Sequence, residues 1–182
     1  MKQVRRGFTI IELVVVIVVI GILAVLVVVA YNGAQGRARD TQRRQDISNI
    51  AKAMELYYND NGTYPVTGGS TTMGANWSAS NDSSWATFES ILKTAGAIDK
   101  LPVDPQNYPS TGAGGTSVAH STLYFSYTIY VNKSTHCGSA IGQMYVILYR
   151  LESTDQETYS DGDCSVNEVG SVYGTSFYRS VK

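Results

Sequence analysis

The chain has 182 residues, with 14 lysines and arginines against 15 aspartates and glutamates, and its formal net charge is −1. The charges are unevenly distributed, because residues 1–52 hold eight basic against three acidic side chains, whereas residues 53–182 hold six against twelve. The acidic second part has no basic stripe, which argues against a nucleic-acid groove there. Apart from an apolar segment near the N-terminus, roughly 150 residues remain, enough for one ordinary domain.

The apolar segment covers residues 8–30, FTIIELVVVIVVIGILAVLVVVA, and follows the basic leader MKQVRRG. Residues 13–30 contain no polar side chain, and a helix of that length spans about 27 Å, close to the thickness of a bilayer's hydrocarbon core. The segment therefore predicts a transmembrane helix. The basic residues of the leader, Lys2, Arg5 and Arg6, favour a cytoplasmic N-terminus by the positive-inside rule.

Glu12 is the one ionisable residue in this segment. A carboxylate at the centre of a spanning helix costs roughly 2.5–3.5 kcal/mol, and less near an interface, so an intramembrane carboxylate indicates a function and a partner. The nearest cations in the sequence are Arg5 and Arg6 in the leader.

The order of these residues resembles the N-terminus of type IV pilins and the related pseudopilins. It consists of Gly7, the hexapeptide FTIIEL and a long aliphatic run. In that family a prepilin peptidase cuts after the glycine, the new terminal residue is methylated on its amine, and the glutamate pairs with the terminal amine of a neighbouring subunit. The resemblance implies that Gly7 is the cleavage-site residue, Phe8 the methylated terminus and Glu12 the assembly carboxylate.

A physical argument agrees with this role of Glu12. Cutting after Gly7 would create an amine a few residues from Glu12, and in a lateral stack of helices that amine and a neighbour's carboxylate would neutralise each other. Removing one partner of such a buried pair costs roughly 3–5 kcal/mol. We therefore expect Glu12→Ala to insert into the membrane but to assemble poorly.

Two other interpretations of residues 8–30 stay open. A cleaved secretory signal is the first, with Val28-x-Ala30 as the cut site, although apolar regions of signals are usually about 7–15 residues long. A plain single-span anchor is the second.

Residues 31–61 predict a continuation of the helix, ended by Asn59-Asp60-Asn61-Gly62. At Asn32-Gly33 and Gly36 the helix either bends or continues at a cost of roughly 1 kcal/mol per glycine. The arginine-rich segment 37–46 has almost no apolar face, so we expect it on a solvent-exposed surface or where the helix leaves the membrane. Its arginines would contact anionic lipid or nucleic acid, or would keep the helix soluble. The apolar face beyond it, spaced by three and four residues, consists of Ile47, Ile50, Ala51, Met54, Tyr57 and Tyr58.

The remaining chain predicts a small antiparallel sheet of three or four strands. Strands are expected at 123–132, 143–151 and 172–181, with one face of the sheet packed on the helix. A loop is expected at 66–84, followed by a short helix with Ser84 as its N-cap and Gly96 as its stop. Residues 101–105, LPVDP, resemble a segment that precedes the sheet in some pseudopilins and minor pilins.

Cys137 and Cys164 are the two cysteines of the chain. In an exported domain a pair is most simply a disulfide, worth roughly 3–4 kcal/mol in the chain-entropy model, and pilins often have one such bond in the C-terminal region. Two unrelated buried thiols are the alternative. The two histidines, His120 and His136, give no zinc spacing with them.

An acidic loop is the only candidate for a cofactor site, and the ion that it would bind is calcium. Its carboxylates do not follow the EF-hand spacing, so a solvated acidic loop is the alternative. No other cofactor is expected, and no nucleophile–base–acid set indicates an enzyme. The candidate calcium ligands are Asp155, Glu157, Asp161 and Asp163.

Together these features predict an α+β protein of the pilin type. Its parts are a leader (1–7), a transmembrane and assembly helix (8–30), the exposed half of that helix (31–61) and a globular head with an antiparallel sheet (62–182). The resemblance implies a structural subunit of a type IV pilus serving motility, adhesion or DNA uptake. The alternatives are a pseudopilin of a type II secretion system and a membrane-anchored binding domain.

The resemblance also implies partners and a location. The precursor would lie in the cytoplasmic membrane with its leader in the cytoplasm, and the assembled filament would lie at the cell surface. The expected partners are prepilin peptidase, other copies of the chain, the assembly platform and its cytoplasmic ATPases. Nucleic acid, which the arginine-rich segment 37–46 would contact, stays open as a less favoured partner.

Overall fold

The computed structural model describes residues 9–66, 69, 77–107, 125–132, 138–152 and 176–181. Within this part the chain forms two helices and four strands. It divides into two compact units, Met1–Ala38 and Arg39–Lys182. The helix α1 runs through the division, and the sheet belongs entirely to the second unit, which we call the head unit.

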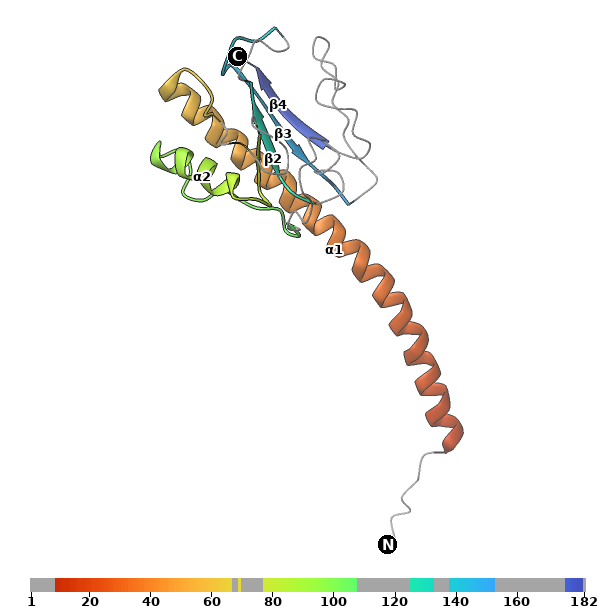
Figure 1. Ribbon diagram of the computed structural model, residues 1–182. Coiled ribbons are helices and arrows are strands. Elements are labelled where there is room, and N and C mark those ends of the chain that lie inside the picture. Colours follow the sequence, from red (N-terminus) through yellow and green to blue (C-terminus); the bar gives the residue numbers. More distant parts are fainter. Residues whose placement is uncertain are drawn as a thin grey trace. The chain divides into compact units, whose positions relative to one another are not determined.

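Helix α1 extends from Ile10 to Asn61 (Figure 1). It is continuous through residues 32–36, so of the two outcomes left open by the sequence, continuation is the one observed. The predicted stop is confirmed, because Gly62 has a φ of 71° and its N–H donates to the carbonyl of Tyr58 at 2.7 Å. Glycine takes this left-handed backbone without the steric cost that a Cβ would add.

Four strands form one antiparallel sheet in sequence order: β1 (Trp77–Ala79), β2 (Thr128–Val131), β3 (Met144–Tyr149) and β4 (Ser176–Val181). The α+β class predicted from the sequence is confirmed. Two strands are shorter than predicted, because β2 begins at Thr128 and β3 ends at Tyr149. Residues 123, 124 and 172–175 of the expected strands lie outside the described residues.

Strand β1 corrects the expectation of an unbroken loop over residues 66–84. Its three residues pair with β2 at the edge of the sheet, and the backbone N–H of Ser80 donates to the carbonyl of Tyr127 at 2.8 Å just beyond it. Glycine, serine and asparagine around such a short strand hide it from pattern analysis, because three residues are too few to show alternation.

Helix α2 (Ser84–Thr94) ends as predicted, since Gly96 has a φ of 69°. Its start differs, because the N-cap is Ser83, and Ser84 is already helical. The Ser84 hydroxyl accepts the N–H of Ala79 at 3.0 Å and donates to the carboxylate of Asp82. Ser84 therefore ties the helix to β1 instead of capping it.

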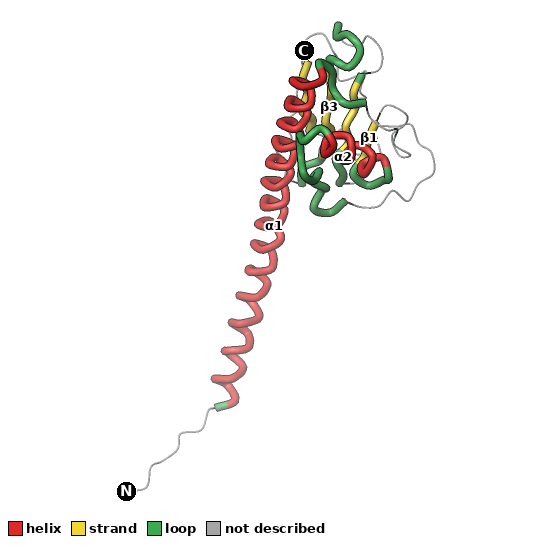
Figure 2. Tube along the Cα trace, turned by 90° about the vertical axis from the view of Figure 1, so that its left-hand side faces the viewer, coloured by secondary structure: helices red, strands yellow, loops and turns green. Residues whose placement is uncertain are grey.

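The core of the head unit lies between one face of the sheet and the two helices. Figure 2 shows α2 beside the second half of α1, with the strands behind both. This confirms that the predicted apolar face of α1 packs against the sheet. Burial of each large side chain contributes about 1.5–3 kcal/mol. The core includes Ile47, Ile50, Met54, Phe88, Leu92, Leu101, Ile129, Tyr145 and Ile147.

Candidate functional site

The first half of α1 presents apolar side chains that nothing in the described part of the chain covers. From Ile10 to Val27 the helix is long and apolar enough to cross a membrane, by length and composition, and none of this window is buried. Fifteen large aliphatic side chains here are between 46% exposed (Val14) and 84% exposed (Ile10). A surface of this size requires lipid or protein neighbours, because soluble monomers rarely expose so much contiguous apolar area.

Glu12 lies at the start of this helix and is joined to Thr9 by a reciprocal set of hydrogen bonds. The Thr9 backbone N–H and hydroxyl donate to Glu12 Oε2 at 2.8 and 2.7 Å, and the Glu12 backbone N–H donates to the Thr9 hydroxyl at 3.3 Å. This is a capping box, which satisfies two donors left free at a helix N-terminus. Glu12 therefore holds the helix start as well as placing a charge there.

The capping box is a feature that our sequence analysis missed. Its signal was present, since Thr9-Ile10-Ile11-Glu12 has the Ser/Thr-x-x-Glu spacing of the motif. A carboxylate in the first turn is also favoured by the positive end of the helix dipole.

Most other predicted site residues lie outside the described part of the chain. They include the cleavage and methylation residues, the cysteine pair and the candidate calcium ligands. Among the residues that are described, no group of three or more His, Cys, Asp or Glu side chains could hold a metal ion. The predicted residues outside the described ranges are Gly7, Phe8, Cys137, Cys164, Asp155, Glu157, Asp161 and Asp163.

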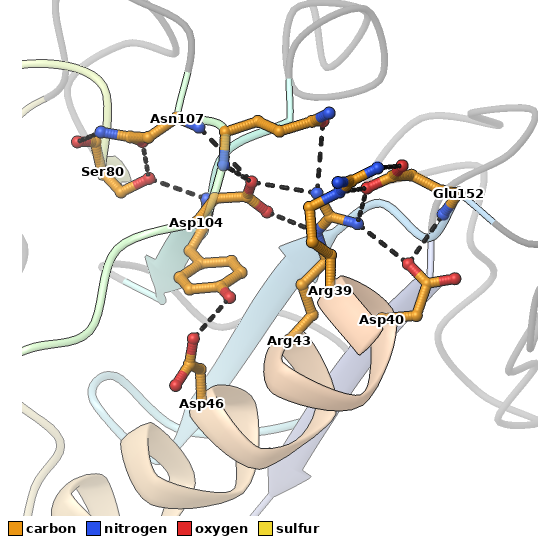
Figure 3. Close-up of polar contacts among 10 residues, drawn as sticks. Arg39, Asp40, Arg43, Asp46, Ser80, Asp104, Asn107 and Glu152 are labelled. Carbon is orange, nitrogen blue, oxygen red and sulfur yellow. Dashed lines mark hydrogen bonds and ion pairs between the residues drawn. The ribbon is translucent and has the colours of Figure 1, made fainter. Parts of the chain in front are cut away.

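A second polar site lies in the head unit, around the fully buried guanidinium of Arg43 (Figure 3). Arg43 reaches Asp104 through two parallel hydrogen bonds, from Nε at 2.7 Å and from Nη2 at 3.1 Å. Its Nη1 donates to Asp40 at 2.9 Å and to Glu152 at 2.7 Å, and its Nη2 also donates to Gln106 at 3.3 Å. All five donors of the guanidinium are thus used.

Arg39 extends this group on its exposed side. Its Nε donates to Oε1 of Glu152 at 2.6 Å and its Nη2 to Oε2 at 2.5 Å, a second bidentate pair. The backbone N–H of Glu152 in turn donates to Asp40 at 2.8 Å. We call Arg39, Asp40, Arg43, Asp104 and Glu152 the arginine cluster. It joins α1, the segment after α2 and the segment after β3.

Aromatic side chains border the arginine cluster. The ring of Phe125 lies 4.4 Å from Arg43 Cζ and 5.2 Å from Arg150 Cζ, within the range of cation–π attraction. Nearby, the Tyr127 hydroxyl donates to Asp46 at 2.8 Å. The cluster is therefore bounded by packed side chains.

The protonation of the cluster follows from these contacts. The hydrogen bond from Arg39 lowers the pKa of Glu152, and the bonds from Arg43 add to this effect against the opposing effect of burial. Burial disfavours the charged form of Arg43, but its bonds to Asp104 and Glu152 outweigh burial and raise its pKa. Burial raises the pKa of Asp46, and this effect outweighs the hydrogen bond from Tyr127, which lowers it. Burial also raises the pKa of the Tyr127 hydroxyl. The pairs that Arg39 and Arg43 form with Glu152 are thus ionised near neutral pH.

The cluster corrects the expectation that residues 37–46 lie on a wet surface. Arg43 and Asp40 are 0% and 1% exposed, whereas Arg44 is exposed as expected. Sequence offers only a partial signal, the spacing of Asp40 and Arg43 along one helix face. Their partners Asp104 and Glu152 are 61 and 109 residues from Arg43, so only the fold identifies them.

Comparison with known proteins bears on the N-terminal segment. Residues 2–28 match the family model described as the prokaryotic N-terminal methylation motif. The chain carries the prepilin signature. That signature supports a type IV pilin or a pseudopilin, and it implies processing by prepilin peptidase and assembly into a filament in general terms. No curated protein and no solved structure matches the chain.

The prepilin signature coincides with the uncovered apolar helix. It includes Thr9 and Glu12 of the capping box and the whole window from Ile10 to Val27. The signature and the helix together indicate a membrane-anchored precursor. The motif belongs to pilin-type structural proteins and not to an enzyme family.

Proposed function

We propose that this chain is a structural subunit of a type IV pilus filament. The observation that supports this most is the apolar helix Ile10–Val27, fully uncovered in the single chain, with the prepilin signature and one carboxylate at its start. Many copies of such a helix cover one another when they bundle. Lipid covers the same surface before assembly.

The proposal gives each N-terminal residue a role. Prepilin peptidase cuts between Gly7 and Phe8, and Phe8 is then methylated on its new amine. Glu12 pairs with the amine of a neighbouring copy and sets the stagger between subunits. Both hydrogen bonds from Thr9 go to Oε2, so Oε1, which accepts none within the described residues, is available to the neighbour.

The location and partners follow from this route. The precursor lies in the cytoplasmic membrane with its leader in the cytoplasm, and the filament lies outside the cell. Prepilin peptidase, an assembly platform and cytoplasmic ATPases act on the chain, which contributes no chemistry of its own.

Intact mass and N-terminal sequencing of the protein from its native membrane or surface fraction test the processing. We expect a mature chain that begins at Phe8 and carries one additional methyl group. A chain that begins at Met1 would make the protein a plain anchor or a membrane-anchored binding domain, and one that begins at Tyr31 would make it a secreted domain.

Three substitutions separate the two roles of the N-terminal carboxylate. Glu12→Gln keeps the capping box, which accepts Glu or Gln, but removes the charge, whereas Thr9→Ala removes the cap and keeps the charge. We expect filaments to be lost in Glu12→Gln and in Glu12→Ala, because a charged pair that loses one partner in an apolar bundle is strongly destabilised. Thr9→Ala should keep most filaments. Normal assembly of Glu12→Gln would show that Glu12 acts as a cap alone.

The second candidate is a pseudopilin of a type II secretion system. The segment LPVDP at residues 101–105 favours it, and Asp104 of this segment binds Arg43 in the arginine cluster. Deletion of the gene distinguishes the two, since loss of surface filaments supports the pilus subunit, whereas loss of a secreted enzyme with filaments intact supports the pseudopilin.

A further inference from the structure

The outer surface of α1 in the head unit carries an exposed leucine between two hollows. One hollow, of about 730 Å³, is lined by Ile47, Ala51 and Tyr149 among others. The other, of about 500 Å³, is lined by α1 and by the segment that contains Ile98 and Val103. Both hollows share Lys52 and Leu56, and Leu56 is 53% exposed. We call this surface the Leu56 face.

The charge of the Leu56 face is uneven. Arg44 and Lys52 border the first hollow, Lys52 and Lys100 border the second, and all three are exposed without an ion pair in the part of the chain that the structure describes. The carboxylates of the same surface are engaged with the head, because Asp46 accepts a hydrogen bond from Tyr127 and Glu55 accepts one from Tyr64 at 2.9 Å. The face thus offers an apolar centre with cations around it.

The same sequence contains a complementary segment. Residues 153–168, STDQETYSDGDCSVNE, hold five carboxylates and no lysine or arginine. Within the single chain, Leu56 and Lys52 stay exposed, so their surface is available to another molecule. In a filament the neighbouring copies are present at high local concentration, and a weak contact between charged surfaces then becomes effective.

We propose that the Leu56 face docks a second copy of this chain through the acidic segment 153–168 of that copy. The inference rests on the proposed filament function and adds to it a contact between heads, separate from the contact between apolar helices. Complementary charges set the register of such a contact and exclude like-charged surfaces. The exposed Leu56 supplies the apolar centre that is typical of interfaces between proteins.

Charge reversal on each side of the contact tests the proposal. Lys52→Glu with Lys100→Glu reverses the face, and Asp155→Lys with Glu157→Lys and Asp161→Lys reverses the segment. Each full-length variant is expressed in the native cell, and sheared surface filaments are quantified by immunoblot and electron microscopy. We expect each variant alone to lose about tenfold or more in filament yield, because like charges then face each other across the contact.

Co-expression of the two variants decides whether the contact lies between copies. Each reversed face then meets a reversed segment on the other chain, so the filament yield should return to within about threefold of the wild-type yield. If both variants lose filaments and co-expression does not restore them, the charges do not act between copies of the chain. That result would overturn the proposal. Normal filaments from either variant alone would overturn it too.

Three controls keep these outcomes interpretable. Lys93→Glu reverses an exposed lysine of α2 outside both hollows and should leave the yield unchanged. Lys52→Gln with Lys100→Gln, which removes charge without reversing it, should give an intermediate loss, and circular dichroism of each variant verifies that it folds. Absence of filaments from the wild-type chain would overturn the proposed function and this inference with it.

Discussion

Arg43 combines complete burial with a complete set of hydrogen-bond partners. Removing a charged group from water is costly, and the cost is offset only when geometry and partners are good. Here the bidentate bonds to Asp104 and the bonds to Asp40 and Glu152 satisfy that condition. At the scale of single residues, Arg43 therefore determines how three distant segments meet.

We predict that Arg43→Ala destabilises the head unit by about 3–5 kcal/mol, because it leaves buried carboxylates without their cation. Arg44→Ala is the matched control, since its side chain is exposed and the expected change is within about 0.5 kcal/mol. Chemical denaturation of the full chain in detergent measures both.

Tryptophan fluorescence is a suitable signal for this experiment. Both tryptophans of the chain, Trp77 and Trp85, lie in the head unit, so the apolar helix does not contribute. A loss of less than about 1 kcal/mol in Arg43→Ala would mean that the carboxylates find other partners, and the cluster would then not hold the fold together.

At the scale of elements, α1 meets two different demands. Its first half is apolar on all sides, as a helix in lipid or in a helical bundle requires. Its second half is amphipathic and supplies Ile47, Ile50 and Met54 to the core of the head unit. The glycines between the two halves do not interrupt the helix, which is continuous from Ile10 to Asn61.

We predict opposite effects of alanine at two glycines of this region. Gly33 is helical and an added Cβ would meet only the tip of Arg37 at 3.6 Å, so Gly33→Ala should stabilise the helix by about 0.5–1 kcal/mol. Gly62 has a φ of 71°, so Gly62→Ala should cost about 1 kcal/mol through backbone strain.

Amide hydrogen exchange of the full chain in micelles measures both effects. Slower exchange is expected around residue 33 in the first variant and faster exchange around residues 58–62 in the second. Faster exchange around residue 33 would show that the backbone there is not helical in the membrane environment.

At the scale of the whole molecule, the two units bury their apolar surface by different means. The head unit has a core of its own, formed by both helices and the sheet. The described side chains of the first unit, from Ile10 to Val27, have no such core and depend on lipid or on other copies. A protein built in this way is complete only when it is embedded or assembled.

The stability of the head unit should depend on pH through Glu152. The bonds from Arg39 and Arg43 lower its folded-state pKa below the ordinary value of 4.5. Its contribution is therefore fully present above pH 4.5 and is lost as the pH falls through the lowered folded pKa. Asp46 has a raised pKa, above its ordinary 3.8, and acts in the opposite direction.

We predict that the head unit of the wild-type chain loses stability on acidification below pH 4.5, and that Glu152→Gln reduces this loss while lowering stability at neutral pH. Asp99→Asn, which changes an exposed aspartate, is the control and should follow the wild-type curve. Thermal unfolding of the full chain between pH 3 and pH 7 measures the difference. An identical loss of stability at acidic pH in the wild type and in Glu152→Gln would contradict the role of Glu152 and its arginine partners.

Local sequence determines the extent of α1, the ends of both helices and the position of Glu12. Continuous apolarity over residues 13–30 and the three- and four-residue spacing that follows predicted the two halves of α1, because helix geometry is read from the nearest few residues. Gly62 and Gly96 marked the helix ends for the same reason. Glu12 was identified because a charge in an apolar run is conspicuous, and its position in the prepilin signature follows from adjacent residues alone.

Only the tertiary structure decided what distant residues do together. The short strand β1 forms because it pairs with the edge of β2. Its three residues by themselves do not predict this pairing. The polar segment 37–46 is partly buried because Asp104 and Glu152 converge on Arg43 from 61 and 109 residues away. A buried charge is tolerated only where its partners are already in place, so its burial is a property of the fold and not of the segment that contains it.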